Sequence, residues 1–261
     1  MPMPYTTNVS ETLVINEIYI SLQGESTFAG LPCIFLRLTA CDLRCSYCDT
    51  VYAFTEGKRR SFAEILARVA ELAVPYQYSA PTPGEGTGPT NARLPLVELT
   101  GGEPLLQKNS VPLMAALCDA GYTVLLETSG AHDISTVDAR VHRIMDLKCP
   151  SSGESGRNRR ANLAHLKATD EIKFVIGTQE DYAWMKAQIR TYKLAKVCPL
   201  LCSWVHPLTP QQASPVLKRV PEEHTPISRQ ELAERIIADA LPVRFQAQLH
   251  KIIWPPEQRG V

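Results

Sequence analysis

Three cysteines fall within the eight residues CDLRCSYC, at positions 41, 45 and 48, and no fourth cysteine follows nearby. Structural zinc sites are normally closed by four Cys or His ligands, usually as two separated pairs. Four thiolates likewise saturate a 4Fe–4S cluster, whereas three leave one iron able to bind a small chelating ligand. Cys41, Cys45 and Cys48 therefore predict a cluster with an open iron, with a chance grouping of cysteines as the simplest alternative.

A second group of possible metal ligands lies further along the chain. Cys198 and Cys202 are four residues apart, and His206 lies four further on. That spacing could serve a metal, but the segment is apolar and strand-like, which favours a core or edge role for these residues. The eight cysteines come without a secretion signal and are expected as thiols rather than disulfides.

The elements that must position these residues alternate between strand and helix. Nearly continuous apolar runs such as YTVLLE (122–127) and EIKFVI (171–176) suit strands of a parallel sheet covered on both faces. Earlier strands are predicted at LVINEIYI (13–20) and CIFLRL (33–38), and a last one in VRFQAQLHKIIW (243–254). Helical periodicity covers residues 61–74, 110–120, 179–193 and 228–240. The pattern predicts one α/β domain of βαβ units over residues 1–261, with a Pro/Gly-rich surface loop inserted at about 75–93.

Polar residues recur where the apolar strands end. In barrel-type α/β folds, functional residues gather at the carboxyl ends of the strands because the loops converge there. Such ends are also where ordinary polar turn residues occur. Five endings together nevertheless predict one shared site, formed by Cys41, residues 100–104, residues 127–130, Asp146 with Lys148, and His250.

Composition argues against several kinds of partner. Lys plus Arg and Asp plus Glu both number 27, so the formal net charge is zero. That balance argues against nucleic acid or an anionic membrane as the main partner. The N-terminus lacks the basic and apolar regions of a secretory signal, and no stretch approaches about 18 apolar residues. We therefore expect a cytoplasmic protein.

The cysteine motif, with Tyr47 before its last cysteine, resembles the signature of radical S-adenosylmethionine enzymes. In that superfamily the open iron is chelated by S-adenosylmethionine, and the reduced cluster cleaves the sulfonium to give a 5′-deoxyadenosyl radical. The sequence GGEP, from Gly101 and Gly102 to Glu103 and Pro104, resembles the superfamily element that binds the methionine amino group. Two glycines let backbone approach a ligand closely, and a carboxylate can accept from an ammonium, although GGEP alone could be a tight turn.

Further stretches narrow the resemblance to the 7-carboxy-7-deazaguanine synthase family. They appear in the order EIYISLQGES (17–26), FLRLTACDLRCSYCDT (35–50), ELTGGEP (98–104), LETSG (126–130), DLKCPSSGE (146–154), DEIKFVI (170–176) and VRFQAQLHKIIW (243–254). The resemblance implies conversion of 6-carboxy-5,6,7,8-tetrahydropterin to 7-carboxy-7-deazaguanine and ammonia, on the route to queuosine and other 7-deazapurines. It also implies a magnesium requirement, a homodimer, an electron donor such as flavodoxin or ferredoxin, and an incomplete TIM-type barrel with reduced helix content.

The same resemblance implies a role for each matching residue. The three cysteines and His250 would be catalytic, and Thr50 would be the magnesium ligand. The substrate contacts would be Leu22, Gln23, Gly24, Glu25, Arg37, Thr100, Glu127 and His250. Amide and carboxylate groups suit a pterin edge, and a guanidinium suits the substrate carboxylate. Without the family, Gln23–Glu25 would be a turn around Gly24, Arg37 a structural ion pair and His250 a structural residue.

The cofactor side is implied in the same way. The residues matching the S-adenosylmethionine pocket are Tyr47, Cys48, Asp49, Gly101, Gly102, Glu103, Ser129, Asp146, Leu147, Lys148, Ser203 and His206. The segment CSWVHPL (202–208) departs from the family, because Trp204 stands where a small turn is expected. Family members can place a C-terminal carboxylate near the substrate, whereas here the tail continues as WPPEQRGV.

Two other functions share part of this pattern. An activase for a glycyl-radical enzyme has the same cysteine spacing, but would dock a protein and would not need Gln23, Thr50 or His250 in this arrangement. A non-catalytic zinc or iron–sulfur module predicts a fourth ligand from the chain, and none is compelling.

Overall fold

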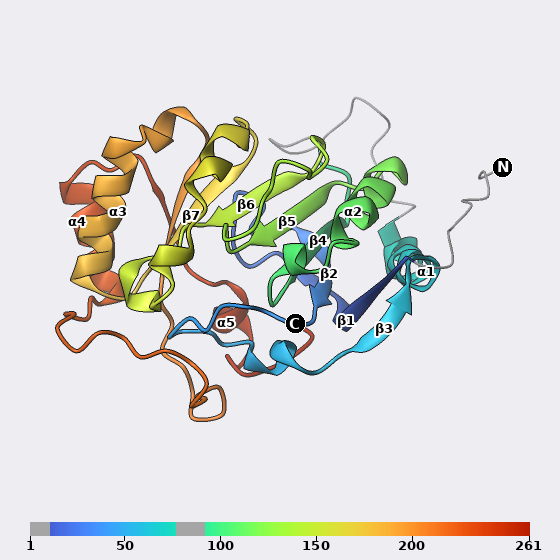
Figure 1. Ribbon diagram of the computed structural model, residues 1–261, viewed down its shortest axis with the longest axis horizontal. Coiled ribbons are helices and arrows are strands. Elements are labelled where there is room, and N and C mark those ends of the chain that lie inside the picture. Colours follow the sequence, from blue (N-terminus) through green and yellow to red (C-terminus); the bar gives the residue numbers. More distant parts are fainter. Residues whose placement is uncertain (1–10, 77–91) are drawn as a thin grey trace.

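A computed structural model describes residues 11–76 and 92–261 of the chain. Within these residues one nine-stranded sheet runs in the order β3-β1-β2-β4-β5-β6-β7-β8-β9 (Figure 1). Strands β2 and β4 to β9 are parallel, whereas β1 pairs antiparallel with β2 and β3. The strands are β1 Thr12–Leu22, β2 Pro32–Leu38, β3 Lys58–Ser61, β4 Leu96–Gly101, β5 Val124–Thr128, β6 His142–Asp146, β7 Glu171–Ile176, β8 Leu200–Trp204 and β9 Arg244–Gln246.

Four helices pack on one face of this sheet and form the larger core with it. These four are α1 Phe62–Ala73, α2 Ser110–Asp119, α3 Gln179–Thr191 and α4 Arg229–Ala238, and a short fifth helix, α5 His250–Ile253, lies near the C-terminus. Ser61 and Glu64 form a capping box at α1, and Thr178 and Asp181 form one at α3. These reciprocal bonds satisfy backbone N–H groups that the first turn leaves without partners, and so fix where each helix begins.

The opposite face carries the site. Its lower part is a small apolar cluster that includes Phe35, Leu96, Leu125 and Ile144. Successive side chains of a strand point to opposite faces, so the residue two positions on shares that face. At each of these strands the face turns polar toward the carboxyl end, through Arg37, Glu98 with Thr100, Glu127 and Asp146. The fold thus aligns polar groups along one edge of an apolar floor.

The predicted fold is confirmed in its main features. The parallel sheet does not close, helices are few, and all four predicted helices form within two residues of their expected bounds. Cys198 and Cys202 are buried in the larger core, which confirms their predicted packing role.

Three expectations need correction. The first two strands are antiparallel because residues 23–31 are too short for the crossover that a parallel pair needs. Strand β3 was not predicted, and only Arg244–Gln246 of the last predicted strand is extended before α5 begins.

Two further expectations concern the inserted loop at about 75–93 and the lack of a membrane-spanning segment. Most of the predicted 75–93 loop lies outside the described residues. Among the helices that are described, none has the length and apolar character needed to cross a bilayer.

Candidate active site

The polar strand ends open into a cavity of about 270 Å³. Besides the strands, the cysteine loop, the turn after β1 and the C-terminal segment from Gln248 onward line it. Of the site residues predicted from the sequence, all but three line this cavity. The three exceptions are Glu103, Leu147 and Ser203, each of which is at most 1% exposed.

The cysteine loop is fixed by the segment that follows β6. Ser46 donates its backbone N–H to the Ser152 carbonyl oxygen at 3.1 Å and its hydroxyl to the Ser151 carbonyl oxygen at 2.7 Å. The Arg44 N–H donates to a Glu154 carboxylate oxygen at 2.7 Å. These bonds come from residues about a hundred positions away, so the loop is part of the tertiary structure rather than a flexible turn.

The three thiols of the loop line the cavity as free cysteines. Burial raises the pKa of Cys41 and of Cys45 to about 11 and raises that of Cys48. Metal binding must therefore displace protons from these thiols. Among the described residues, no three Cys, His, Asp or Glu side chains form a group suited to a single metal ion. Three thiols without a fourth ligand are the donor set that a cluster with an open iron requires.

The two glycines of GGEP bring the end of β4 against the backbone that leads into the cysteine loop. A Cβ added at Gly101, where φ is +134°, would lie 2.3 Å from the Leu38 carbonyl oxygen. A Cβ at Gly102 would lie 2.0 Å from the Ala40 carbonyl oxygen and 3.0 Å from the Cys41 Cβ. Any larger residue would displace the start of the loop, so both glycines position the cysteine loop.

Glu103 makes hydrogen bonds within the protein that its sequence motif did not indicate. Its carboxylate is fully buried and accepts from the Thr128 hydroxyl at 2.9 Å and from the Ser129 N–H and hydroxyl at 2.8 and 2.6 Å. It also accepts from the Leu105 N–H at 3.0 Å. The carboxylate thus holds the end of β5, and its predicted contact with a ligand ammonium stays a prediction.

Several buried polar atoms near the cysteines lack a partner. Lys148 Nζ pairs with one oxygen of Asp146 at 2.7 Å, while Asp146 Oδ1 and the Tyr47 hydroxyl are buried without a hydrogen bond from any described residue. Both side chains line the cavity. A buried polar group left unpaired costs about 1–3 kcal/mol. A polar ligand that supplied these partners, as S-adenosylmethionine can, would therefore be favoured here.

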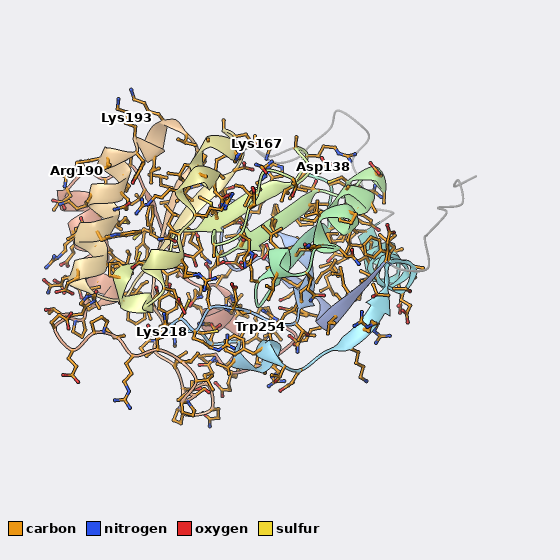
Figure 2. All side chains as sticks on the ribbon, viewed as in Figure 1. Asp138, Lys167, Arg190, Lys193, Lys218 and Trp254 are labelled. Carbon is orange, nitrogen blue, oxygen red and sulfur yellow. The ribbon has the colours of Figure 1, made fainter. Side chains whose placement is uncertain are left out.

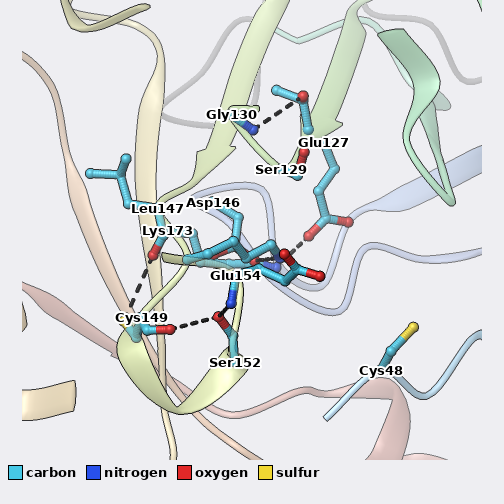
Figure 3. A network of polar contacts seen from close by, with 12 residues as sticks. Cys48, Glu127, Ser129, Gly130, Asp146, Leu147, Cys149, Ser152, Glu154 and Lys173 are labelled. Carbon is cyan, nitrogen blue, oxygen red and sulfur yellow. Dashed lines mark hydrogen bonds and ion pairs between the residues drawn. The ribbon is translucent and has the colours of Figure 1, made fainter. Parts of the chain in front are cut away.

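Lys173 on β7 joins two of the predicted substrate-binding carboxylates. Its Nζ lies 2.9 Å from Glu25 Oε2 and also pairs with Glu127, which reaches from β5 toward Asp146 and Lys173 in Figure 3. The Thr100 hydroxyl donates to Glu127 at 3.1 Å, and Gln248 donates to Glu25 at 2.7 Å. Burial opposes ionisation of Glu25, but the charge and hydrogen bonds of Lys173 and Gln248 outweigh it and lower the pKa of that carboxyl to about 2.

Arg37 forms the structural ion pair that was the alternative to its predicted substrate contact. Its Nε lies 3.0 Å from Glu17 Oε2, and its Nη2 donates to the Tyr19 hydroxyl at 3.0 Å. The Tyr52 hydroxyl also donates to Glu17, at 3.2 Å. Arg37 lines the cavity, and its Nη1 makes no hydrogen bond within the described part of the chain. The ion pair thus leaves one nitrogen of a fixed guanidinium for an anion.

The C-terminal segment closes over the turn after β1. The Leu249 N–H donates to the Gly24 carbonyl oxygen at 3.0 Å. A Cβ at Gly24 would lie only 2.4 Å from His250 Nδ1, so the imidazole occupies the space that glycine leaves free. Burial lowers the pKa of His250 although the Glu25 and Asp49 carboxylates oppose it, which keeps the imidazole neutral at neutral pH.

Thr50 follows the last cluster cysteine directly. It begins a short 3-10 turn, Val51–Phe54, without using its hydroxyl as a cap. The hydroxyl lies 3.7 Å from Cys48 Sγ and the residue lines the cavity, so an oxygen ligand is available beside the cysteine loop. Its neighbour Asp49 is 2.5 Å from Lys251 Nζ.

Residues 202–208 have Trp204 where the resemblance leads one to expect a small turn, and this side chain fixes the segment. Trp204 Nε1 donates to the Ile227 carbonyl oxygen at 2.9 Å, and its ring lies edge-on to that of His206 at 6.1 Å. His206 lines the cavity, whereas Ser203 is buried beneath it with an unpaired hydroxyl.

Sequence reasoning missed several lining residues that the fold brings in. Glu98 precedes Thr100 by two positions, so strand alternation was a usable signal. Lys173 lies on the strand EIKFVI and could have been found in the same way. The tail had been considered only for its terminal carboxylate, and no signal pointed to Arg259, whose guanidinium lies 3.6 Å from the centre of the Tyr52 ring and pairs with Glu56 at 2.7 Å. Val261 also lines the cavity, so the tail reaches the predicted site.

Comparison with known proteins gives consistent matches over nearly the whole chain. The chain is 43% identical to a 7-carboxy-7-deazaguanine synthase of Koribacter versatilis, covering 95% of this chain and 99% of that one. It is 39% identical to the enzyme of the same name from Chlorobaculum tepidum, covering 95% of this chain and 97% of that one. No protein-family model matches the chain.

Solved structures share the fold at lower identity. The crystal structure of QueE from Escherichia coli superposes with a TM-score of 0.63 at 21% identity, covering 92% of this chain and 95% of that one. Streptococcus suis SuiB bound to S-adenosylmethionine superposes with a TM-score of 0.51 at 14% identity, covering 80% of this chain and 48% of SuiB.

Proposed function

The chain belongs to the 7-carboxy-7-deazaguanine synthase family, and we propose that it makes 7-carboxy-7-deazaguanine and ammonia from 6-carboxy-5,6,7,8-tetrahydropterin by radical S-adenosylmethionine chemistry. One observation carries the proposal. A single cavity brings the three cysteines of the loop together with the polar strand ends that would hold the substrate. The product would enter the biosynthesis of queuosine and other 7-deazapurines.

The cysteine side of the cavity would hold the cofactors. Cys41, Cys45 and Cys48 would ligate a 4Fe–4S cluster, and the unpaired polar atoms of Tyr47 and Asp146 would take hydrogen bonds from S-adenosylmethionine. When both are bound and the cluster is reduced, the cluster and S-adenosylmethionine would supply the radical that abstracts a hydrogen atom. The Thr50 hydroxyl, which makes no capping bond, would serve as a ligand of Mg²⁺ together with substrate oxygens and waters.

The strand-end side would hold the substrate. The free nitrogen of Arg37 would pair with the substrate carboxylate, since a guanidinium already fixed by Glu17 loses little freedom on binding. Glu25, ionised at neutral pH, would accept N–H groups of the ring. The neutral imidazole of His250 can take a proton at one nitrogen and return it during the rearrangement.

The partners follow from the same reading. We propose that the protein forms a homodimer. We also propose that it is cytoplasmic, which accords with the eight free cysteines in the described structure. The electron donor would be an acidic carrier such as flavodoxin or ferredoxin. In two ion pairs beside the cysteine loop the cation is the more exposed member, with Lys218 (Figure 2) at 47% against Glu154 at 5% and Arg157 at 49% against Asp42 at 29%, whereas in a third pair Asp49 at 25% is more exposed than Lys251 at 5%. A surface of that sign favours an acidic partner.

The test is an anaerobic assay. The protein is reconstituted with iron and sulfide, reduced, and given S-adenosylmethionine, Mg²⁺ and 6-carboxytetrahydropterin, and 7-carboxy-7-deazaguanine is sought by mass spectrometry. We expect product that depends on both the cluster and S-adenosylmethionine. Release of 5′-deoxyadenosine without deazaguanine would show that the substrate is a different one. Binding of zinc in place of iron would show a non-catalytic metal-binding module.

A further inference from the structure

Glu98 is a buried acid at the floor of the cavity with no predicted role. It lies on β4, is 2% exposed, and pairs across the sheet with Phe35 on β2 and Leu125 on β5. Both neighbours belong to the apolar cluster beneath the cavity. A carboxylate between apolar side chains loses most of its hydration, so burial disfavours its ionised form.

The charges around Glu98 do not compensate that loss. The nearby ammonium of Lys173 is already bound by Glu25 and Glu127, and the Arg37 guanidinium is bound by Glu17. With all three carboxylates ionised, one cation would face three anions in a shared space. Burial and then the charge of Glu127 raise the pKa of Glu98 well above its ordinary value, against the pull of Lys173. Glu98 is therefore the member of this group that keeps its proton.

The hydrogen bonds around Glu98 leave one oxygen for a ligand. Gln23 donates its Nε2–H to Glu98 Oε2, and its own Oε1 accepts from the Glu25 N–H at 2.9 Å. This chain fixes which way the Gln23 amide points. Glu98 Oε1 has no partner among the described residues, and Glu98 lines the cavity. The proton on Glu98 can therefore sit on Oε1, directed at whatever the cavity holds.

We propose that Glu98 is a neutral hydrogen-bond donor that gives its Oε1–H to an acceptor atom on the ring of the bound substrate. The inference rests on the proposed function for the identity of that substrate. Pterins and deazaguanines carry a 2-amino-lactam edge, on which N–H donors stand beside a carbonyl acceptor. The carboxylate oxygens of Glu25 and Glu127 suit the ring donors, while the nearest cation, Lys173, is already bound to both of them and Arg37 would pair with the substrate carboxylate. A neutral Glu98 supplies the missing donor.

Two substitutions separate this role from its alternatives. Glu98→Gln keeps a neutral side chain with a donor and can still accept from Gln23, whereas Glu98→Met keeps the volume but removes both. We expect Glu98→Gln to keep KM within about threefold of wild type. We expect Glu98→Met to raise KM tenfold or more with kcat nearly unchanged, because a ring acceptor then stays unpaired in the bound state. Glu71→Gln, on the exposed side of α1, is the matched control.

The pH profile and a ligand-free spectrum complete the test. The wild-type KM should rise at alkaline pH as Glu98 loses its proton, and Glu98→Gln should lack that rise. The other titratable groups that face Glu98 are Tyr19, Glu25, Cys33, Arg37, Glu127 and Lys173. In the ligand-free protein at pH 7, the infrared difference between wild type and Glu98→Gln should show a protonated carboxyl band.

The outcomes are distinct. A carboxylate band in place of the protonated one overturns the proposal whatever the enzyme makes. A Glu98→Gln variant as impaired as Glu98→Met would show that the negative charge is what matters. A Glu98→Met variant with wild-type KM would show that Glu98 makes no contact with substrate. The infrared result does not depend on turnover, so it stands even if the proposed reaction fails.

Discussion

Replacing Lys173 by methionine should cost about 3 kcal/mol of the free energy of unfolding at pH 7. Methionine is unbranched and only one heavy atom shorter than lysine, but it leaves Glu25 and Glu127 without their cation. Against the effect of burial, Lys173 is the main group that lowers the pKa of Glu25 from an ordinary 4.5 to about 2, with smaller contributions from Gln248 and His250, and a pKa change of one corresponds to about 1.4 kcal/mol. Removing one partner from a buried ion pair typically costs about 3–5 kcal/mol, which agrees in size.

The sign of the pH dependence follows from the lowered pKa. A carboxyl with a depressed folded-state pKa stabilises the protein above its ordinary pKa, and that contribution is lost as the pH falls through the folded value. The wild type should therefore lose this contribution between pH 4.5 and about 2. Lys173→Met should lack it already at neutral pH and show a flatter dependence in that window.

Urea denaturation followed by circular dichroism measures the effect. Lys186→Met, which breaks an exposed pair with Asp239, is the control and should cost less than about 1 kcal/mol. The double variant Lys173→Met with Glu25→Gln should recover part of the loss, because it removes one unpaired charge. A Lys173→Met variant as stable as the control would show that Lys173 does not neutralise these carboxylates.

Three further predictions concern the cavity. Gly24→Ala should push the His250 imidazole aside and raise KM about tenfold with little change in stability, and His250→Ala in that background should add no further loss. Cys45→Ala should abolish iron loading and turnover, whereas Cys118→Ala, at a half-buried position on α2, should keep both, as iron analysis after anaerobic reconstitution would show. Because burial lowers the pKa of His250, the unfolded state takes up its proton first, so stability should fall as the pH drops below about 6.5. His250→Phe should remove that slope from unfolding curves recorded at several pH values, and an unchanged slope would contradict the pKa direction.

Much of the fold could be read from local pattern because local chemistry determines it. Ser61 followed by Glu64 marks the start of α1, and the structure has that capping box. Continuous apolar runs marked the parallel strands. The antiparallel start of the sheet was missed although the short connection after β1 required it.

The cysteine loop was readable for a different reason, since three ligands of one cluster must be close in sequence to share a loop. Contacts across long sequence distances were not readable in that way. Lys173 and Glu25 are 148 positions apart, and no local sequence pattern in either segment predicts their contact. Glu103 shows the opposite limit, because its motif suggested a ligand contact while burial and four donors give it a structural role here.

Electron paramagnetic resonance of the reduced, fully iron-loaded protein, with and without S-adenosylmethionine, shows whether the cysteine loop leaves one iron open to the cavity. If Cys41, Cys45 and Cys48 leave one iron open to the cavity, S-adenosylmethionine binds that iron and changes the spectrum of the reduced cluster. An unchanged spectrum at full iron loading would contradict the account, because the cluster would then be closed by a fourth ligand or turned away from the cavity.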